Sequence, residues 1–296
     1  MNHAGQKESV DRFGFLPYQD AIVFDGGRVS PVAEYDKVLA CVDEHTHEDG
    51  FLYPPLERRI NESGEQVPRT ERPAHLHHVP ASHELLLYAN GTKEDLRKGP
   101  GAFVIHLLAY LFGLRLQFHD WWFDGRIPIR LTHNIITTHA TMEHFVSHCY
   151  WTWKGWPKER QKKFTNVLIM HSRVPSYEWD WERFMIEYIV FDGCYKLAEG
   201  PQRAGGTQRF DFLCNQFGIP SDSDVVQKIV GLRNDLFHET LWDNSQPCTG
   251  VSESAFMQSY NLRRLNQRLI PALLGYMNSY VQTSWWFHGS FSFTQP

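Results

Sequence analysis

Apolar residues in the second half of the chain recur every three or four positions, which is the spacing of amphipathic helices. The pattern starts near residue 137 and predicts an all-α bundle whose helices are joined by short loops. Pro157 suits the first turn of one helix, and Gly200 and Gly218 suit helix ends. Pro271 predicts a kink in the last helix. The predicted helices cover residues 138–153, 158–173, 181–200, 209–220, 221–242 and 252–281.

The first half has shorter apolar pieces separated by glycine and proline, which favours strands and turns. We expect strands within residues 21–27, 83–89 and 114–131, and a short buried helix at 101–113 that ends at Gly113. Residues 54–73 are polar and rich in proline, which predicts an exposed loop. The fold class is therefore α+β. A mixed or β-rich region, residues 1–136, precedes an all-α domain, residues 137–296.

Composition narrows the classes of function. Hydrophobic residues make up 42% of the 296, enough for a large core, and the net charge is −5. A protein that coats nucleic acid without specificity is usually basic, so any contact with RNA has to be local. The five cysteines include no CxxC pair, which favours reduced thiols over disulfides or a zinc ribbon. No apolar leader or membrane-length run is present, so we expect a cytoplasmic protein with no membrane partner.

The stretch GLRNDLFHETLW, residues 231–242, combines helical apolar spacing with chemistry-bearing side chains. On a helical wheel Arg233 falls near the middle of the apolar arc, with Asn234 and His238 at its edge. A guanidinium without a partner in an apolar interior costs several kcal/mol. Arg233 therefore needs an anion. Either a carboxylate pairs with it inside the fold, or the helix lines a groove that receives a phosphate.

The spacing of this arginine and histidine is common, so its context matters more than the spacing itself. Arg69/His75 and Arg126/His133 also match R-x4-6-H, but each pair spans a proline at an interior position. Only Arg233 and His238 lie on a proline-free amphipathic helix with an amide directly after the arginine.

These residues resemble a known family. RNDLFH resembles the R-[N/D/H]-x3-H signature of HEPN (higher eukaryotes and prokaryotes nucleotide-binding) domains. Residues 181–200 are similar to the long first helix of ApeA-like HEPN domains, on which the mid-helix acid is Asp192. Residues 209–220 and 221–242 are similar to the following short helix and the motif helix. The resemblance covers roughly residues 178–280.

The resemblance implies a metal-independent endoribonuclease without cofactor. Such domains commonly form homodimers, in which two R-x4-H helices face each other across one cleft. The RNA 2′-hydroxyl attacks the adjacent phosphorus and leaves 2′,3′-cyclic phosphate and 5′-hydroxyl ends. His238 would move protons, Arg233 would hold phosphate oxygens, and Asn234 would bind phosphate or orient His238. The family also suggests a toxin or antiphage effector, whose first half senses a trigger or restrains the nuclease.

Two alternatives stay open on the sequence. Some HEPN domains keep the fold without cleaving RNA, so the chain is alternatively a non-catalytic module that dimerises and binds a nucleotide or a protein. Asp192 could orient Arg233 or His238, or it could simply pair with Arg233 or Lys196. Glu187, on the same helix, is the second candidate acid.

Two basic segments are candidate contacts for an RNA backbone, with Trp153 or Trp156 available to stack on a base. Each is equally compatible with a solvated helix face. Their basic residues are Lys158, Arg160, Lys162, Lys163, Arg263, Arg264 and Arg268.

Histidine-rich segments offer a third function class, a His-ligated metallohydrolase. His144 and His148 are four residues apart on a predicted helix, with His139 and Glu143 nearby, which is a spacing that can hold a metal. Residues 44–49 and 75–83 are also rich in histidine. The competing interpretation is that these side chains pack or form hydrogen bonds, and we expect no metal at the functional site. The aromatic segment 284–293 is expected to cover the core or a dimer face.

Overall fold

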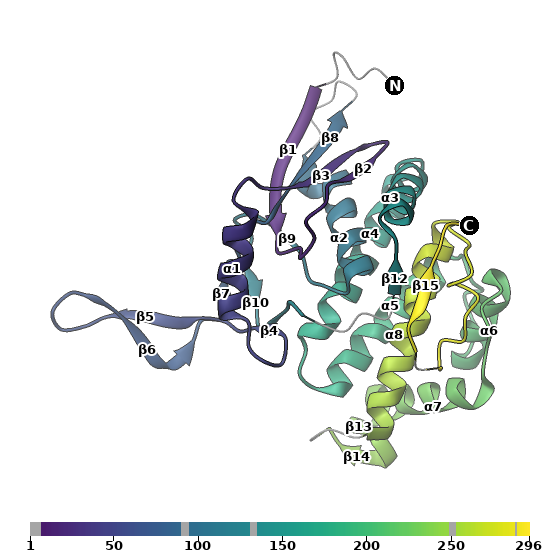
Figure 1. Cartoon of the computed structure of the whole chain (residues 1–296). Helices are drawn as coiled ribbons and strands as arrows, with labels where there is room; N and C mark the ends of the chain where they lie inside the picture. Colours follow the sequence, from purple (N-terminus) through teal and green to yellow (C-terminus); the bar gives the residue numbers. More distant parts are fainter. Residues whose placement is uncertain (1–6, 90–94, 131–134, 249–252, 288) are drawn as a thin grey trace.

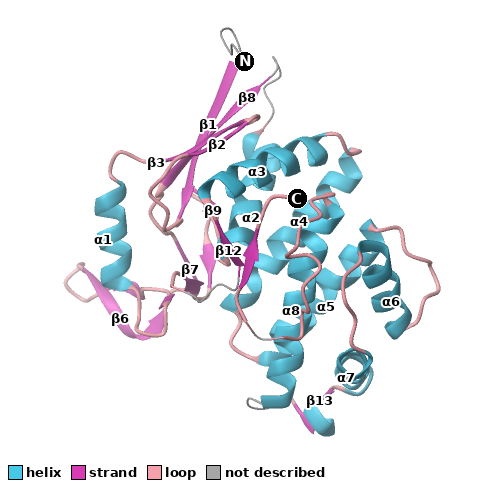
Figure 2. Cartoon of the chain, turned by 45° about the vertical axis from the view of Figure 1, so that its right-hand side comes forward, coloured by secondary structure: helices cyan, strands magenta, loops and turns pink. Residues whose placement is uncertain are grey.

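A computed structural model describes residues 7–89, 95–130, 135–248, 253–287 and 289–296. The chain is α+β, with strands gathered in the N-terminal part and most helices in the C-terminal part (Figures 1 and 2). This arrangement confirms the predicted fold class. Within the described ranges, no helix has both the length and the apolar character that a membrane crossing requires.

The main sheet has five antiparallel strands in the order β2-β3-β8-β1-β9. Its central strand β8 confirms the strand predicted at 83–89, and the β2–β3 hairpin confirms the strand and turn predicted at 21–27. Apolar side chains alternate with polar ones on these strands because one face packs on the core. The strands are β1 (Lys7–Gly14), β2 (Ile22–Phe24), β3 (Gly27–Pro31), β8 (His83–Ala89) and β9 (Gln117–Phe118).

The helix α2 (Pro100–Phe112) connects the sheet to the helical part. It is buried along nearly its whole length and ends at Gly113, whose positive φ of 66° lets the chain turn away. Both features match the prediction for 101–113. α2 packs against α3 (His139–Lys154) and α4 (Lys158–Arg173). Its buried side chains belong to the same apolar cluster as those of the sheet.

Residues 54–73 differ from the predicted loop. They contain an antiparallel hairpin of β5 (Leu56–Ile60) and β6 (Gln66–Pro73), which stands away from the body of the molecule (Figure 1). The predicted exposure is correct, since Ile60 is 71% exposed. The strands were missed because a hairpin without a buried face lacks the apolar alternation that identifies strands.

Smaller elements complete the N-terminal part beside α1 (Tyr35–His45). The predicted strand region 114–131 is broken into three two-residue strands rather than one or two longer ones. The short pairs are β4 (Phe51–Leu52) with β11 (Ile127–Pro128), and β7 (Leu76–His77) with β10 (Phe123–Asp124).

The C-terminal helices follow the predicted order, but some of them end earlier than predicted. The third predicted helix ends at Leu197 instead of Gly200, and the last ends at Leu273, two residues after Pro271, instead of continuing to 281. The proline therefore lies in the final turn rather than at a mid-helix kink. The remaining helices are α5 (Asp180–Leu197), α6 (Gly206–Phe217), α7 (Ser223–Asn234), α8 (Glu253–Leu273) and the short η1 (Leu96–Lys98), η2 (Val174–Ser176) and η4 (Asp243–Ser245).

The aromatic C-terminal segment packs on the core, which confirms one of the two roles expected for it. β15 (Phe291–Phe293) pairs in parallel with β12 (Ile135–Thr137), and Trp285 is fully buried (Figure 1). One apolar cluster runs from Phe13 in the sheet through Phe145 to Trp285. The two halves of the sequence therefore contribute side chains to a common core. A second pair of short strands, β13 (Leu241–Trp242) and β14 (Gln246–Pro247), follows α7.

We predict that the C-terminal segment contributes strongly to stability through Phe293. Its ring is 2% exposed and lies 5.0 Å from the ring of Phe145 and 5.6 Å from that of Tyr276. Phe293→Ala should lower the free energy of unfolding by about 3–5 kcal/mol in urea titrations. The matched control is Phe287→Ala, because Phe287 is 63% exposed and its removal should cost less than ~0.5 kcal/mol. Equal losses in both variants would contradict this assignment.

Candidate functional site

The motif helix changes its geometry within the motif. α7 starts at an Asp222 cap, whose Oδ1 accepts from the backbone N–H groups of Asp224 and Val225, and it ends at Asn234. A π-helical turn, η3 (Asp235–Glu239), follows, and the N–H of Thr240 donates to the carbonyl of Asp235. The predicted helix over 221–242 is thus α-helical only up to Asn234. Wider turns of this kind occur frequently at functional sites.

The π-helical turn brings the arginine and the histidine together. On an α-helix, residues five apart point about 140° away from each other, whereas the i to i+5 hydrogen bonds of a π-turn place them one above the other. Arg233 Nη1 lies 2.8 Å from Nε2 of His238 and 3.1 Å from Oδ1 of Asn234. The three motif side chains therefore form one hydrogen-bonded group.

This contact fixes the tautomer of the imidazole. A guanidinium can only donate, so Nε2 of His238 accepts the hydrogen bond and the ring proton lies on Nδ1. Asn234 likewise accepts through its carbonyl oxygen, and its amide N–H groups stay available. His238 and Asn234 are exposed, while Arg233 is half-buried.

Arg233 is not neutralised by an acid within the described part of the chain. No carboxylate oxygen of those residues lies within 4.0 Å of it, and its guanidinium carbon sits 5.8 Å from the ring centre of Tyr188 and 5.4 Å from that of Phe237. Aromatic faces attract a cation without cancelling its charge. Among the described residues the guanidinium of Arg233 has no carboxylate partner, and its contacts are Asn234, His238 and the two aromatic rings.

Asp192 pairs with Arg209, and not with Arg233 or Lys196, the two partners that the sequence suggested. Its Oδ1 accepts from Arg209 of α6 at 2.6 Å, which ties α6 to α5. The carboxylate is still close enough to Tyr188 to affect it: burial first, then Asp192, raises the pKa of Tyr188, while Arg233 opposes the rise. Asp192 therefore lies near the motif, but its hydrogen-bond partner in the described part of the chain is Arg209 and not Arg233, His238 or Lys196.

Glu187, the second candidate acid, is fully buried and belongs to a hydrogen-bonded network. Its carboxylate accepts from Nδ1 of His171 at 3.1 Å, from Arg263 at 2.9 Å and from Asn266 at 2.7 Å. These contacts hold the pKa of Glu187 below its ordinary value although burial opposes them. A carboxylate sealed in this way cannot orient His238, so its role is to hold α4, α5 and α8 together.

The structure does not support the RNA contact predicted for the second basic segment. Arg263 is engaged by Glu187, and Arg264 and Arg268 are only 1% and 0% exposed. Arg264 donates to the carbonyl of Gly289, and Arg268 donates to the carbonyls of Thr283 and Ser284. The C-terminal segment covers these arginines, so they cannot guide an RNA backbone in this conformation.

The first basic segment lies at the start of α4. Lys158, Lys162 and Lys163 are exposed, which keeps the predicted RNA contact open. Arg160 donates to Glu199 at 3.3 Å and lies 4.6 Å from the ring centre of Trp156.

Trp153 is 3% exposed, stacks on Phe103 and donates to the carbonyl of Gln161, so it cannot stack on a base.

The histidines of α3 have separate partners. His139 Nδ1 contacts the hydroxyl of Tyr18 at 2.7 Å, His144 Nδ1 contacts the hydroxyl of Tyr276, and His148 Nε2 donates to the carbonyl of Leu274. In the described ranges, no three histidine, cysteine, aspartate or glutamate side chains form a cluster suited to a metal ion. The α3 histidines therefore follow the packing interpretation.

Comparisons with protein-family models, with curated proteins and with solved structures give no match to this chain.

We predict that His83, from the histidine-rich segment 75–83, makes stability depend on pH. Its ring is fully buried, contacts Ser82 Oγ and donates to the carbonyl of Tyr18. Burial lowers the pKa of His83 from 6.5 to about 4. The unfolded chain therefore takes up a proton below pH 6.5 that the folded chain refuses until about pH 4, and stability falls as pH drops through this window by up to ~1.4 kcal/mol per pH unit.

The test compares His83→Asn with the unsubstituted protein in urea at pH 7.5, 6 and 5. At pH 7.5 the difference in unfolding free energy reports lost packing alone. By pH 5 the difference should shrink by about 2 kcal/mol, because only the unsubstituted protein loses the linked stability. A difference that stays constant across the three pH values would refute the prediction.

Proposed function

We propose that the motif group of Arg233, Asn234 and His238 cleaves RNA as a metal-independent endoribonuclease. The observation that carries the proposal is the π-helical turn, which places an imidazole 2.8 Å from a guanidinium that lacks an acidic partner within the described residues. A positive group next to a proton-transfer group is what phosphodiester cleavage requires. The resemblance to HEPN domains points to the same chemistry.

The chain's own side chains account for the steps of the reaction. A phosphate entering the site draws Arg233 onto its non-bridging oxygens, where charge increases in the transition state. This shift uncovers Nε2 of His238, which then accepts the proton of the 2′-hydroxyl. The 2′-oxygen bonds to phosphorus, the bond from phosphorus to the 5′-oxygen breaks, and the leaving oxygen takes up a proton. The products are a 2′,3′-cyclic phosphate and a 5′-hydroxyl.

The need for two proton-transfer groups supports a homodimer. In an in-line displacement the attacking and leaving oxygens lie on opposite sides of phosphorus. A single imidazole cannot take a proton on one side and donate one on the other at the same time. A second copy of the chain would supply the second His238, and the exposed ring of Phe237, 43% accessible, would lie at such an interface.

The first basic segment extends the proposal to substrate binding. The exposed Lys158, Lys162 and Lys163 would attract the RNA backbone electrostatically. An effector role, as a toxin or in antiphage defence, belongs to the same proposal. In that setting the N-terminal part would control access to the motif.

We predict that the full-length protein cleaves labelled single-stranded RNA in excess EDTA. His238→Ala should lower the rate about 10²–10⁴-fold through loss of proton transfer, and Arg233→Ala about 10²–10³-fold through loss of charge stabilisation. The measurement is single-turnover cleavage on sequencing gels, with the product ends tested for a cyclic phosphate. RNA with a single 2′-deoxy substitution at the cleavage position should stay intact there.

The matched control is Lys228→Ala, an exposed basic side chain on α7 outside the motif, which should leave the rate unchanged. If the protein binds RNA with an affinity that depends on Arg233 but leaves it intact, the motif is a binding module and the nuclease assignment is wrong. Cleavage that persists in both motif variants would place the reaction elsewhere or in a contaminant.

A further inference from the structure

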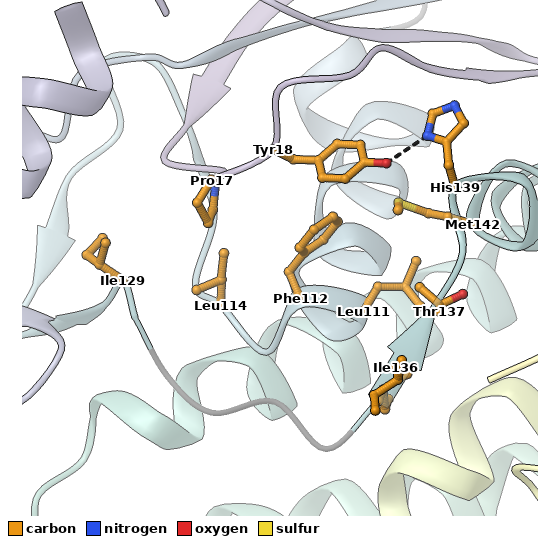
Figure 3. Close-up of a pocket in the computed structure, with 11 residues that line it drawn as sticks. Pro17, Tyr18, Leu111, Phe112, Leu114, Ile129, Ile136, Thr137, His139 and Met142 are labelled. Atoms are coloured by element: carbon orange, nitrogen blue, oxygen red, sulfur yellow. Dashed lines mark hydrogen bonds between the residues drawn. The ribbon is translucent and has the colours of Figure 1, made fainter. Parts of the chain in front are cut away.

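A pocket of about 420 Å3 lies where the sheet meets the helices, and no motif residue lines it (Figure 3). Its walls come from the segment after β1, the end of α2, the strand β12 and the start of α3. The side chains that define it are Pro17, Tyr18, Leu111, Leu114, Ile136 and His139.

The pocket is shaped by the core itself. Leu111 and Leu114 are only 4% and 3% exposed, so their positions are fixed by packing rather than by solvent. Most of the remaining wall is aliphatic or aromatic, and water in such a space finds few hydrogen-bond partners. The volume falls in the range of small-molecule sites, roughly 300–1,000 Å3. A small apolar molecule would therefore gain by displacing this water.

One wall carries a hydrogen bond between Tyr18 and His139, and a carboxylate lies close to the far side of the imidazole. The Tyr18 hydroxyl lies 2.7 Å from Nδ1 of His139, and Nε2 of His139 lies 3.2 Å from Oε1 of Glu143 (Figure 3 draws the first contact). The negative charge of Glu143 favours the ring proton on the nearer nitrogen, Nε2, so Nδ1 accepts from the hydroxyl of Tyr18. The oxygen of Tyr18 is then left as an acceptor for a ligand that donates.

The charges near this wall select against anions. Burial, followed by the carboxylates of Asp20 and Glu143, raises the pKa of Tyr18, so the hydroxyl stays neutral. No arginine or lysine is among the described residues that line the pocket. An anionic ligand beside Tyr18 would be repelled by the nearby carboxylates of Asp20 and Glu143, with no lysine or arginine among the described lining residues to offset them, whereas a cation would be attracted.

We propose that this pocket binds a small, mainly apolar molecule that is neutral or cationic and donates a hydrogen bond to the Tyr18 hydroxyl oxygen. An aromatic amine has this chemistry. The site is distinct from the Arg233 and His238 group, so its failure would leave the proposed RNA cleavage untouched.

The test titrates the full-length protein with three probes that share one ring system: tryptamine, indole and indole-3-acetate. Ligand-observed NMR and calorimetry give the affinities. Tryptamine and indole should bind, and indole-3-acetate should bind at least tenfold more weakly than tryptamine. Tyr18→Phe, which removes the hydroxyl and with it both the acceptor oxygen and the hydrogen bond to His139, should weaken tryptamine about fivefold.

A second variant, in which a larger side chain fills the pocket, decides the question if Tyr18→Phe does not fold. Ile136 is 57% exposed at the pocket, so Ile136→Trp should fold while blocking the space and weakening tryptamine at least tenfold. The matched control is Ile60→Trp on the exposed β5–β6 hairpin, which should leave the affinity unchanged. Absence of tryptamine binding, equal binding of indole-3-acetate, or full affinity in Ile136→Trp would each overturn the proposal.

Discussion

The packing of the helical part has to place partners around the buried carboxylate of Glu187. An ion of this kind is tolerated in an interior only when its charge is matched and its oxygens are bonded. His171 of α4 and Arg263 and Asn266 of α8 meet both requirements. The neighbouring helices α4 and α5 and the later helix α8 are thereby fixed against one another, and any relative shift would leave the ion unmatched. Removing a single partner therefore threatens the whole arrangement rather than one contact.

The candidate site takes its position from the same helix. Tyr188 follows Glu187 on α5 and presents its ring to Arg233, which α7 carries. The charge of Glu187 on α5 is thus matched by its partners. Arg233, which contacts α5 through Tyr188, has no acidic partner among the described residues. This contrast separates the two roles that charged residues have here. The matched set orders the bundle, and the guanidinium of Arg233 is the group on which the proposed chemistry rests.

Sequence reasoning succeeded where a local signal decides the outcome. Gly113 and Gly218 end their helices as predicted, because a left-handed residue is a local requirement. It failed where distant segments decide. Arg264 and Arg268 read as a basic surface, but the carbonyls of Gly289 and Thr283 from the C-terminal segment accept their hydrogen bonds and both are buried. The π-helical turn has no pattern in the amino-acid sequence, so the contact between Arg233 and His238 could be argued only from family resemblance and not from helical geometry.

The parallel pairing of β12 and β15 determines how fast their backbone amide hydrogens exchange with solvent. Its amide protons are shielded by a partner more than 150 positions away, between Ile135 and Phe291. They can exchange with deuterium only when the two strands separate, so both segments share one opening free energy. The same separation uncovers Phe293. Protection at these few amides would therefore serve as a reporter for how often the common core opens in the native protein.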